Sequence, residues 1–254
     1  MFLNNSFDHN IIADNLDKYG YAILNNVFKT EIIKKLNIEA KNKIIELNKK
    51  FSLNEKHLKK TIFEEVVNSS KMKQLFETIH KKSSRYDTNF NCHFLLNHTP
   101  SKHIKHNKLS FHFDAYKLTM IIPINTEDKN DNDHAMSLDI IPNIRKETNS
   151  MIINLIYKSA FQNKIFRKFS NTNFFNNIFK KKTLNIKYGE LVIFNGFRSL
   201  HSASISKSRS QSEKTRLIIH SYNPFENNKI NKIIFNRIQK NRDKKINDGS
   251  GGGI

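Results

Sequence analysis

The spacing of apolar residues in the first third of the chain predicts one short strand followed by two helices. Residues 21–27 read as the strand. Apolar residues then recur at helical spacing from Thr30, which can cap the helix. A second helix is predicted to start at Thr61, where Glu64 has the spacing of a capping box. The two apolar faces comprise Ile32, Ile33, Leu36, Ala40, Ile44 and Leu47, and then Val66, Val67, Met72, Leu75, Phe76 and Ile79.

The remainder of the chain reads mainly as short strands. These are expected around residues 89–98 and over 109–125, 135–143, 189–196 and 215–223, with a polar loop at 128–133. An insertion at about 149–182 opens with a helical stretch, and a basic helix is expected over 226–246. Residues 247–254 read as a flexible tail. Helices followed by many short strands favour one α+β domain over residues 1–246 with a mainly β core.

Composition agrees with a folded, soluble domain. The chain has 254 residues and 37% hydrophobic content, enough for a sizeable core. No run of about eighteen apolar residues indicates a membrane span, and the N-terminal segment lacks a secretory layout. Cys92 is the single cysteine, which excludes an intramolecular disulfide and reads as a small buried hydrophobe. A cytoplasmic location is therefore expected.

The formal net charge of +20 has two interpretations. It can indicate a nucleic-acid or other polyanionic partner. It can also reflect compositional drift, because Lys, Asn, Ile and Phe are all abundant and the basic residues are scattered. We favour drift and keep a basic nucleic-acid-binding module as an alternative. An anionic small-molecule substrate would need only a few of these charges.

A metal-binding pattern is the strongest chemical signal in the sequence. His112 and Asp114 lie two residues apart in a strand-like segment, so both side chains would point to one face. His201 follows an apolar strand and a glycine-containing turn, which places it at a strand end. Two histidines and one carboxylate with open positions form the facial arrangement of non-haem Fe(II) oxygenases.

Arg216 stands fifteen residues beyond His201 and opens another strand. A guanidinium there can bind a carboxylate through two parallel hydrogen bonds. Ile218, His220 and Tyr222 would share the face of Arg216 and are candidate pocket walls. Each of these residues alone has an ordinary structural explanation, but the order of the whole set is unlike a chance pattern.

The other histidines and acidic residues carry weaker signals. Most of them read as solvated polar side chains, and His93 or Asn97 are outside candidates for pocket contacts. The solvated set comprises His93, His98, His103, His106, Asp131, Asp133 and His134.

Three segments give the sequence a family resemblance over about residues 17–225. They are YGYAILNNVFKTEIIKKL, AMSLDIIPNIRK and KYGELVIFNGFRSLHSAS. Together with the metal pattern, they resemble the phytanoyl-CoA dioxygenase-like branch of the Fe(II)/2-oxoglutarate oxygenases. The chain departs from that pattern where Asn143, Ile144 and Arg145 replace Gly-Ser-His, and where Glu190 replaces an aspartate.

The resemblance implies a double-stranded β-helix, a jelly-roll or cupin-like barrel, with flanking helices. It implies that His112, Asp114 and His201 are the catalytic metal ligands for Fe(II), and that Arg216 binds the far carboxylate of the cosubstrate 2-oxoglutarate. The implied reaction uses O2, releases succinate and CO2, and hydroxylates a small molecule. A carboxylate at Asp114 favours hydroxylation, because related halogenases carry a small residue there.

Two alternatives stay open at this point. One is a cupin-type metal enzyme that does not use 2-oxoglutarate, and the other is the basic nucleic-acid-binding module. The substrate would be selected by the 149–182 insertion, by the loop before His112, and by Tyr116 and Arg198 near the pocket mouth. An anionic group on that substrate is one candidate, and no membrane partner is expected.

Overall fold

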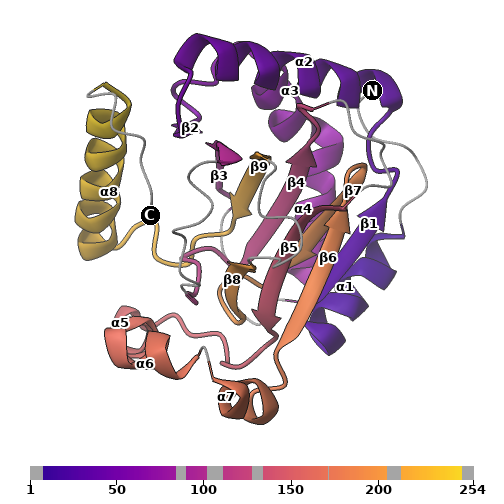
Figure 1. Ribbon diagram of the computed structural model, residues 1–254. Coiled ribbons are helices and arrows are strands. Elements are labelled where there is room, and N and C mark those ends of the chain that lie inside the picture. The colour runs from indigo at the N-terminus through magenta and orange to yellow at the C-terminus, as the bar shows by residue number, and fades with distance from the viewer. Residues whose placement is uncertain are drawn as a thin grey trace.

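The computed structural model describes residues 8–83, 90–101, 111–127, 134–170, 172–204 and 213–247. Its strands form two antiparallel sheets, one with the order β1-β7-β4-β9-β3-β2 and one with the order β6-β5-β8 (Figure 1). The strands are β1 (Tyr21–Asn25), β2 (Phe51–Asn54), β3 (Cys92–Thr99), β4 (Leu118–Ile124), β5 (His134–Ile141), β6 (Lys182–Lys187), β7 (Glu190–Phe194), β8 (Leu200–Ser204) and β9 (Lys214–Ser221). The helices are α1 (His9–Tyr19), α2 (Thr30–Leu47), α3 (Ile62–Asn68), α4 (Ser70–Ser83), α5 (Met151–Gln162), α6 (Lys164–Phe169), α7 (Asn173–Ile178) and α8 (Lys229–Asn247).

Alternation along the strands divides the molecule into two apolar layers. Leu217 and Ile219 of β9 belong to the large core that the larger sheet forms with α1–α4. Ile218 lies between them and faces the second core, which includes residues of both sheets. The inner face of β9 therefore looks into the space between the sheets. Pairing among the described strands does not close the two sheets into a barrel.

The two helices predicted in the first third of the chain form, with differences in capping and continuity. Helix α2 covers the predicted residues, but its N-cap is Lys29, so the predicted cap at Thr30 was wrong. The single helix predicted from Thr61 is two helices, because Ser69 adopts an extended backbone between α3 and α4.

The predicted capping box at Thr61 does not form. The Thr61 hydroxyl donates to the carbonyl of Leu58 at 2.7 Å, and the Glu64 carboxylate accepts from the backbone N–H of Lys60 at 2.7 Å. Both side chains therefore bond to the turn before the helix and not to each other's backbone. The residue types alone could not show that these two sets of hydrogen bonds compete.

Six elements were not predicted, namely α1, β2, α6, α7, β6 and β8. Helix α1 is capped by Asp8, whose carboxylate accepts hydrogen bonds from the backbone N–H groups of Asn10 and Ile11. Strands β2 and β6 lie at sheet edges, where short segments with one polar face give a weak signal.

The C-terminal end of α1 is tied to two turns of the β region. Gly20 ends the helix with a φ of +79°. The side-chain amides of Asn143 and Asn195 both donate to the carbonyl of Leu16, at 3.3 and 2.9 Å. The backbone N–H of Asn195 donates to the carbonyl of Gly20 at 3.0 Å. Helix α1 is thereby fixed to the connection between β7 and β8.

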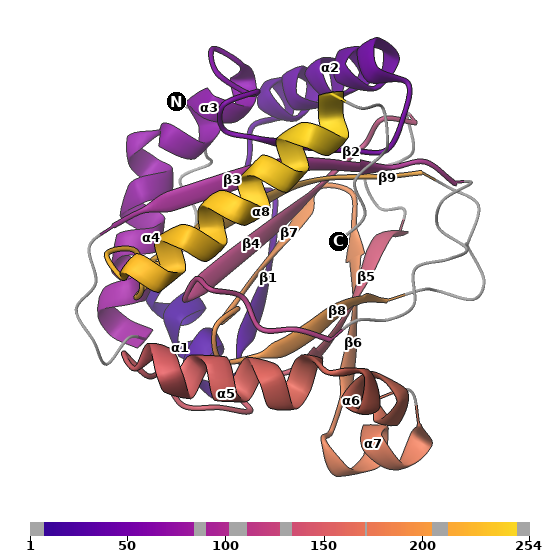
Figure 2. The ribbon, with the colours of Figure 1, turned by 90° about the vertical axis from the view of Figure 1, so that its left-hand side faces the viewer.

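The insertion and the C-terminal helix flank the sheets, and both predicted helices are confirmed. Helix α8 crosses the front of the larger sheet in Figure 2, and α5 runs along its lower edge with α6 and α7 at one end. Gln239 of α8 accepts a hydrogen bond from Asn54 of β2 at 2.8 Å. The flexible tail was predicted over residues 247–254, but Asn247 ends α8 and residues 248–254 lie outside the described residues. None of the described helices has the length and apolar character to cross a membrane.

Replacing Gly20 by alanine is expected to destabilise the fold. An added Cβ would lie 2.6 Å from the Pro142 Cβ, at a φ that disfavours side chains. We expect a loss of roughly 2–4 kcal/mol in the free energy of unfolding, measured by urea titration. Gly189→Ala is the control, because Gly189 has a φ of +81° and should lose only the smaller backbone contribution. Equal losses in the two variants would contradict close packing against Pro142.

Candidate metal centre

The structure brings His112, Asp114 and His201 together. One ligand atom from each lies within 4.8 Å of the other two. The Nε2 atom of His201 is 3.4 Å from the Asp114 carboxylate, and the Nε2 atom of His112 is 3.8 Å from it. Asp114 and His201 are buried, whereas the His112 side chain is 48% exposed. The cluster therefore has a buried base and one side open to solvent.

Backbone pairing holds the three residues in place. His112 and His201 exchange two N–H to carbonyl hydrogen bonds, of 2.9 and 3.0 Å, in an isolated antiparallel bridge. The N–H of Asp114 donates to the carbonyl of Gly196 at 3.0 Å. His112 and Asp114 thus lie outside a regular strand, contrary to the prediction, and regular pairing starts at Leu118. His201 lies inside β8 and pairs with Ile140 of β5.

The hydrogen bond at the far side of the His201 ring orients its free nitrogen. The Nδ1–H donates to the carbonyl of Ser199 at 3.1 Å. In the neutral imidazole, this contact leaves Nε2, the atom nearest Asp114, free to bind a metal. Metal-binding histidines usually have such a partner on the second ring nitrogen, because it fixes both the tautomer and the orientation of the ring.

A polar chain supports the Asp114 carboxylate from behind. The Thr119 hydroxyl donates to Asp114 Oδ2, and its oxygen lies 3.0 Å from His220 Nδ1. The hydroxyl proton is committed to the carboxylate, so the Thr119 oxygen accepts from the imidazole. His220 was predicted as a pocket wall, and the structure places it next to Asp114. The role of Thr119 was not predicted from the sequence.

Gly196 leaves the space that this chain needs. A Cβ at Gly196 would overlap Thr119 Oγ1 and lie 2.5 Å from Asp114 Oδ2. The glycine in FNGF therefore permits close approach of the turn to the carboxylate. The sequence shows a glycine before His201, but not which side chain occupies the adjacent space.

Charges within the cluster stabilise one another. Burial would raise the pKa of Asp114, but His201 and His220 outweigh it and hold that pKa well below the usual range. Burial would lower the pKa of His201, but Asp114 outweighs it and raises that pKa above its usual 6.5. Without a metal, the cluster therefore favours a carboxylate paired with a protonated imidazole.

Arg216 lies on the inner face of β9, two and four residues before Ile218 and His220. Its neighbours in the register are Asn97 of β3 and Pro123 of β4. Burial lowers the pKa of the guanidinium. Within the described residues the guanidinium has no ion-pair or hydrogen-bond partner, and the Asn97 side-chain oxygen is also buried without one. Among the described residues, the space between the sheets therefore holds a guanidinium and an amide oxygen that have no hydrogen-bond partner.

Some predicted pocket residues lie elsewhere. Strand β9 ends at Ser221, and Tyr222 has a φ of +62°. Its ring stacks on His80 of α4, in the core beneath the helices, so Tyr222 does not share the Arg216 face as predicted. Arg198 lies 3.5 Å from the carboxylate of Asp17 on α1, where the predicted pocket-mouth role has no support.

Two histidines that were read as solvated are buried. His93 lies 2.6 Å from the Glu55 carboxylate and contacts the ring of Phe235 on α8. His98 lies 2.9 Å from the Thr215 hydroxyl. These strand positions face ordered polar partners that a single sequence does not reveal. His103, His106, Asp131 and Asp133 lie outside the described residues, and so does the side chain of His134.

Three further residues named in the sequence analysis have defined surroundings, namely Tyr116, Cys92 and Glu190. The Tyr116 ring stacks on His220 with a centroid separation of 5.2 Å, and burial raises the pKa of its hydroxyl. Cys92 is half-buried at the edge of the large core, and burial raises the pKa of its thiol to about 12. The Glu190 carboxylate accepts from the N–H of Lys187 at 2.9 Å and closes the turn before β7.

The sequence did not predict the buried position of Arg145 beside the metal ligands. Its side chain is buried between the rings of Phe113 and Phe197, each 4.0 Å from the guanidinium carbon. Its Nε donates to the carbonyl of Phe197, and its Nη1 donates to Asn154 of α5 at 3.0 Å. Phe113 separates the two ligands His112 and Asp114 in sequence. Arg145 therefore joins both ligand segments to the insertion.

Comparisons by sequence identify no family model and no curated protein that matches this chain. Solved structures do match. A prolyl 4-hydroxylase from Phytophthora capsici has a TM-score of 0.55 at 15% identity, over 89% of this chain and 69% of that one. The non-heme alpha ketoglutarate dependent epimerase SnoN from nogalamycin biosynthesis has a TM-score of 0.55 at 10% identity, over 85% and 83%. EctD from S. alaskensis with bound Fe has a TM-score of 0.55 at 11% identity, over 87% and 79%.

These neighbours are Fe- and 2-oxoglutarate-dependent oxygenases, which have a double-stranded β-helix fold. At these identities the likeness shows the fold alone, because one fold can carry several chemistries. It confirms the predicted architecture of helices and antiparallel sheet. The function must be argued from the side chains of this chain.

Replacing Gly196 by alanine is expected to weaken metal binding by about ten- to a hundredfold, because the new methyl group displaces the Asp114–Thr119 pair. The dissociation constant for Mn(II), measured by electron paramagnetic resonance, tests this expectation. Far-UV circular dichroism checks that the fold persists. Ala203→Gly, a change of the same size on β8, is the control. An unchanged Mn(II) affinity in Gly196→Ala would show that the metal does not need this carboxylate geometry.

Metal uptake is expected to release a proton. The raised pKa of His201 means that its imidazole carries a proton up to a higher pH than usual, and a metal ligand must be neutral. Affinity for Mn(II) should fall by about tenfold per pH unit once the pH drops below that raised pKa. Calorimetric titration in buffers of different ionisation enthalpy measures the released proton. Binding heats independent of the buffer would count against this assignment.

Proposed function

We propose that the protein is an Fe(II)- and 2-oxoglutarate-dependent dioxygenase that hydroxylates a small molecule. The observation that carries this proposal is that His112, Asp114 and His201 meet beside Thr119 and His220, on the face of the larger sheet that also carries Arg216. Among the described residues the Arg216 guanidinium has no partner. The similarity of three segments to the phytanoyl-CoA dioxygenase-like branch supports placing the protein there.

The residues fit a resident Fe(II) ion. Two imidazole nitrogens and one carboxylate oxygen are a suitable donor set for Fe(II), and they leave positions open for other ligands. The exposed edge of His112 provides access from solvent. When bound, Fe(II) and 2-oxoglutarate supply the activation of O2 that accompanies oxidative decarboxylation to succinate and CO2.

Arg216 has the position required to bind the far carboxylate of the cosubstrate. Four residues of extended strand separate it from His220, which is about 13 Å along β9. The arginine side chain and a five-carbon dicarboxylate can together bridge that length. Asn97 lies opposite Arg216 on β3 and can add an amide N–H to the same carboxylate. A planar guanidinium binds a carboxylate through two hydrogen bonds.

The space between Arg216 and the triad is apolar. Ile218 pairs with Leu95 on one side and with Ile121 on the other, so these residues form one row across the inner face of the sheet. This row can cover the methylene carbons of the cosubstrate and exclude water from them. Thr119 and His220 form the next pair on this face, on the side away from Arg216. They hold the Asp114 carboxylate in its charged form and in a fixed orientation.

The two alternative functions, a cupin-type enzyme and a nucleic-acid-binding module, differ from the oxygenase in the role that they give Arg216. A cupin-type enzyme without 2-oxoglutarate gives this half-buried cation no ligand. A basic nucleic-acid-binding module needs exposed cations and no triad, and its binding would weaken steeply with salt. The position of Arg216 on the inner face therefore favours the oxygenase.

Replacing Arg216 by methionine is expected to raise the KM for 2-oxoglutarate by about a hundredfold, because it removes a charge-assisted bidentate contact. Succinate formation with Fe(II), O2 and varied 2-oxoglutarate measures this effect, using the slow turnover that proceeds without substrate. Arg237→Met on exposed α8 is the matched control and should behave as wild type. His112→Ala should abolish turnover. Wild-type KM in Arg216→Met would assign the cosubstrate contact to another residue, and turnover in His112→Ala would remove the triad.

A further inference from the structure

Two basic side chains lie on the insertion side of the triad, away from Arg216. They are Arg145, at the start of the insertion, and Lys158 on α5. Arg145 packs on Phe113, the residue between His112 and Asp114, and donates to Asn154 of α5. Lys158 lies one helical turn after Asn154 and so shares that face of α5. The Asp114 carboxylate stabilises the charged forms of both basic groups. The two cations also repel each other. Two like charges beside one site are unfavourable unless something anionic joins them.

Arg145 cannot turn away from the site. Both Phe rings and two hydrogen bonds hold its guanidinium, and its Nη2 group is buried with no hydrogen-bond partner among the described residues. Burial lowers the pKa of Arg145 to about 10, so it is charged at neutral pH. Arg145 is therefore a fixed positive charge at the wall of the site.

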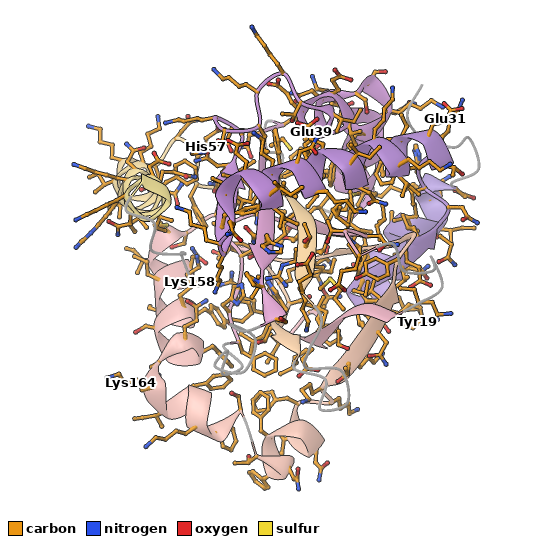
Figure 3. The ribbon with its side chains drawn as sticks, turned by 45° about the horizontal axis from the view of Figure 1, so that its top comes forward. Tyr19, Glu31, Glu39, His57, Lys158 and Lys164 are labelled. Atoms are coloured by element: carbon orange, nitrogen blue, oxygen red, sulfur yellow. The ribbon has the colours of Figure 1, made fainter. Side chains whose placement is uncertain are left out.

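Lys158 is better placed to touch a ligand. It is half-buried on α5 and follows Tyr157, whose ring centroid is 5.5 Å from the Arg145 guanidinium carbon. Within the described part of the chain, its ammonium has no hydrogen-bond partner and no carboxylate at ion-pair distance. Lys164, at the start of α6, is by contrast exposed, and Figure 3 labels both lysines.

The charges of the loaded site explain why these cations matter. A divalent metal, Asp114, Arg216 and dianionic 2-oxoglutarate together have no net charge. Once a metal neutralises Asp114, no other carboxylate of the described residues lies at ion-pair distance from Arg145 or Lys158. Two partly desolvated positive charges then remain where α5 and Arg145 pack on the ligand segment, and a negatively charged group there would be strongly favoured.

We propose that Lys158, with Arg145 behind it, binds an anionic group of the substrate, a carboxylate or a phosphate. The proposal rests on the proposed oxygenase function and specifies its substrate class. Lys158 makes the direct contact, and Arg145 contributes a fixed charge. The substrate then lies between the metal and α5, so the insertion determines specificity.

Binding of matched probes tests the subsite. Hexanoate, hexyl phosphate and hexanamide share an alkyl chain and differ in their polar group. Each is titrated into protein loaded with Mn(II) and saturating 2-oxoglutarate, and paramagnetic broadening of its proton resonances reports binding next to the metal. We expect at least one anion to bind about tenfold more tightly than the amide. The anion that binds more tightly identifies the group as carboxylate or phosphate.

Variants separate the subsite from general charge effects. Lys158→Met should abolish the preference for the anion, Lys158→Arg should retain it, and Lys164→Met, with the same loss of charge, should bind as wild type. If hexanamide binds as tightly as both anions, or if Lys158→Met keeps the preference, the subsite is wrong while the oxygenase proposal stands. Absence of Mn(II) binding before any probe is added would contradict the proposed function itself, and the subsite with it.

Discussion

The connection between β7 and β8, residues 195–199, is the constraint on which the rest of the centre depends. Its backbone carbonyls accept hydrogen bonds from three different parts of the site. Gly196 binds the N–H of Asp114, Phe197 binds the side chain of Arg145, and Ser199 binds the ring of His201. A buried carbonyl needs a partner, and here each partner is a functional residue or its support. The turn therefore sets the relative positions of two triad members and the nearby cation.

The same turn connects the centre to the outer elements. The Asn195 side chain caps the end of α1, and the Ser199 hydroxyl accepts the N–H of Asn143. Arg145 extends the connection through Asn154 to α5. Because these contacts are buried and directional, a shift of α1 or of the insertion would be transmitted to Asp114 and His201. The helical insertion is thus part of the framework of the site as well as its cover.

The sequence alone was enough to predict that the three metal-ligand candidates meet. It was not enough to predict the side chains that hold them in place. The meeting of His112, Asp114 and His201 could be predicted because their residue types and spacing are ones that a strand-rich domain can bring together. Their roles, and that of Arg216, stay predictions. Helix α2 and most strands followed from apolar periodicity. The break at Ser69 and the exchanged partners of Thr61 and Glu64 could not be predicted, because they depend on competition between local hydrogen bonds.

Residues that act through tertiary contacts gave the least signal. Thr119 reads as one more β-branched strand residue, and Arg145 was noted only as part of the departure from Gly-Ser-His. His93 and His98 read as solvated, yet both are buried. Tyr222 follows β9 in phase, but its positive φ turns the ring to the opposite side of the sheet. Each of these positions depends on a partner far away in the chain, which composition and periodicity do not specify.

A crystal structure with Mn(II) and 2-oxoglutarate, using anomalous scattering to locate the metal, tests the central claim most directly. Our account predicts one Mn(II) ion bound by Nε2 of His112, Nε2 of His201 and the Asp114 carboxylate, with the far carboxylate of 2-oxoglutarate on Arg216. An ion bound elsewhere, or a cosubstrate carboxylate that does not contact Arg216, would contradict it.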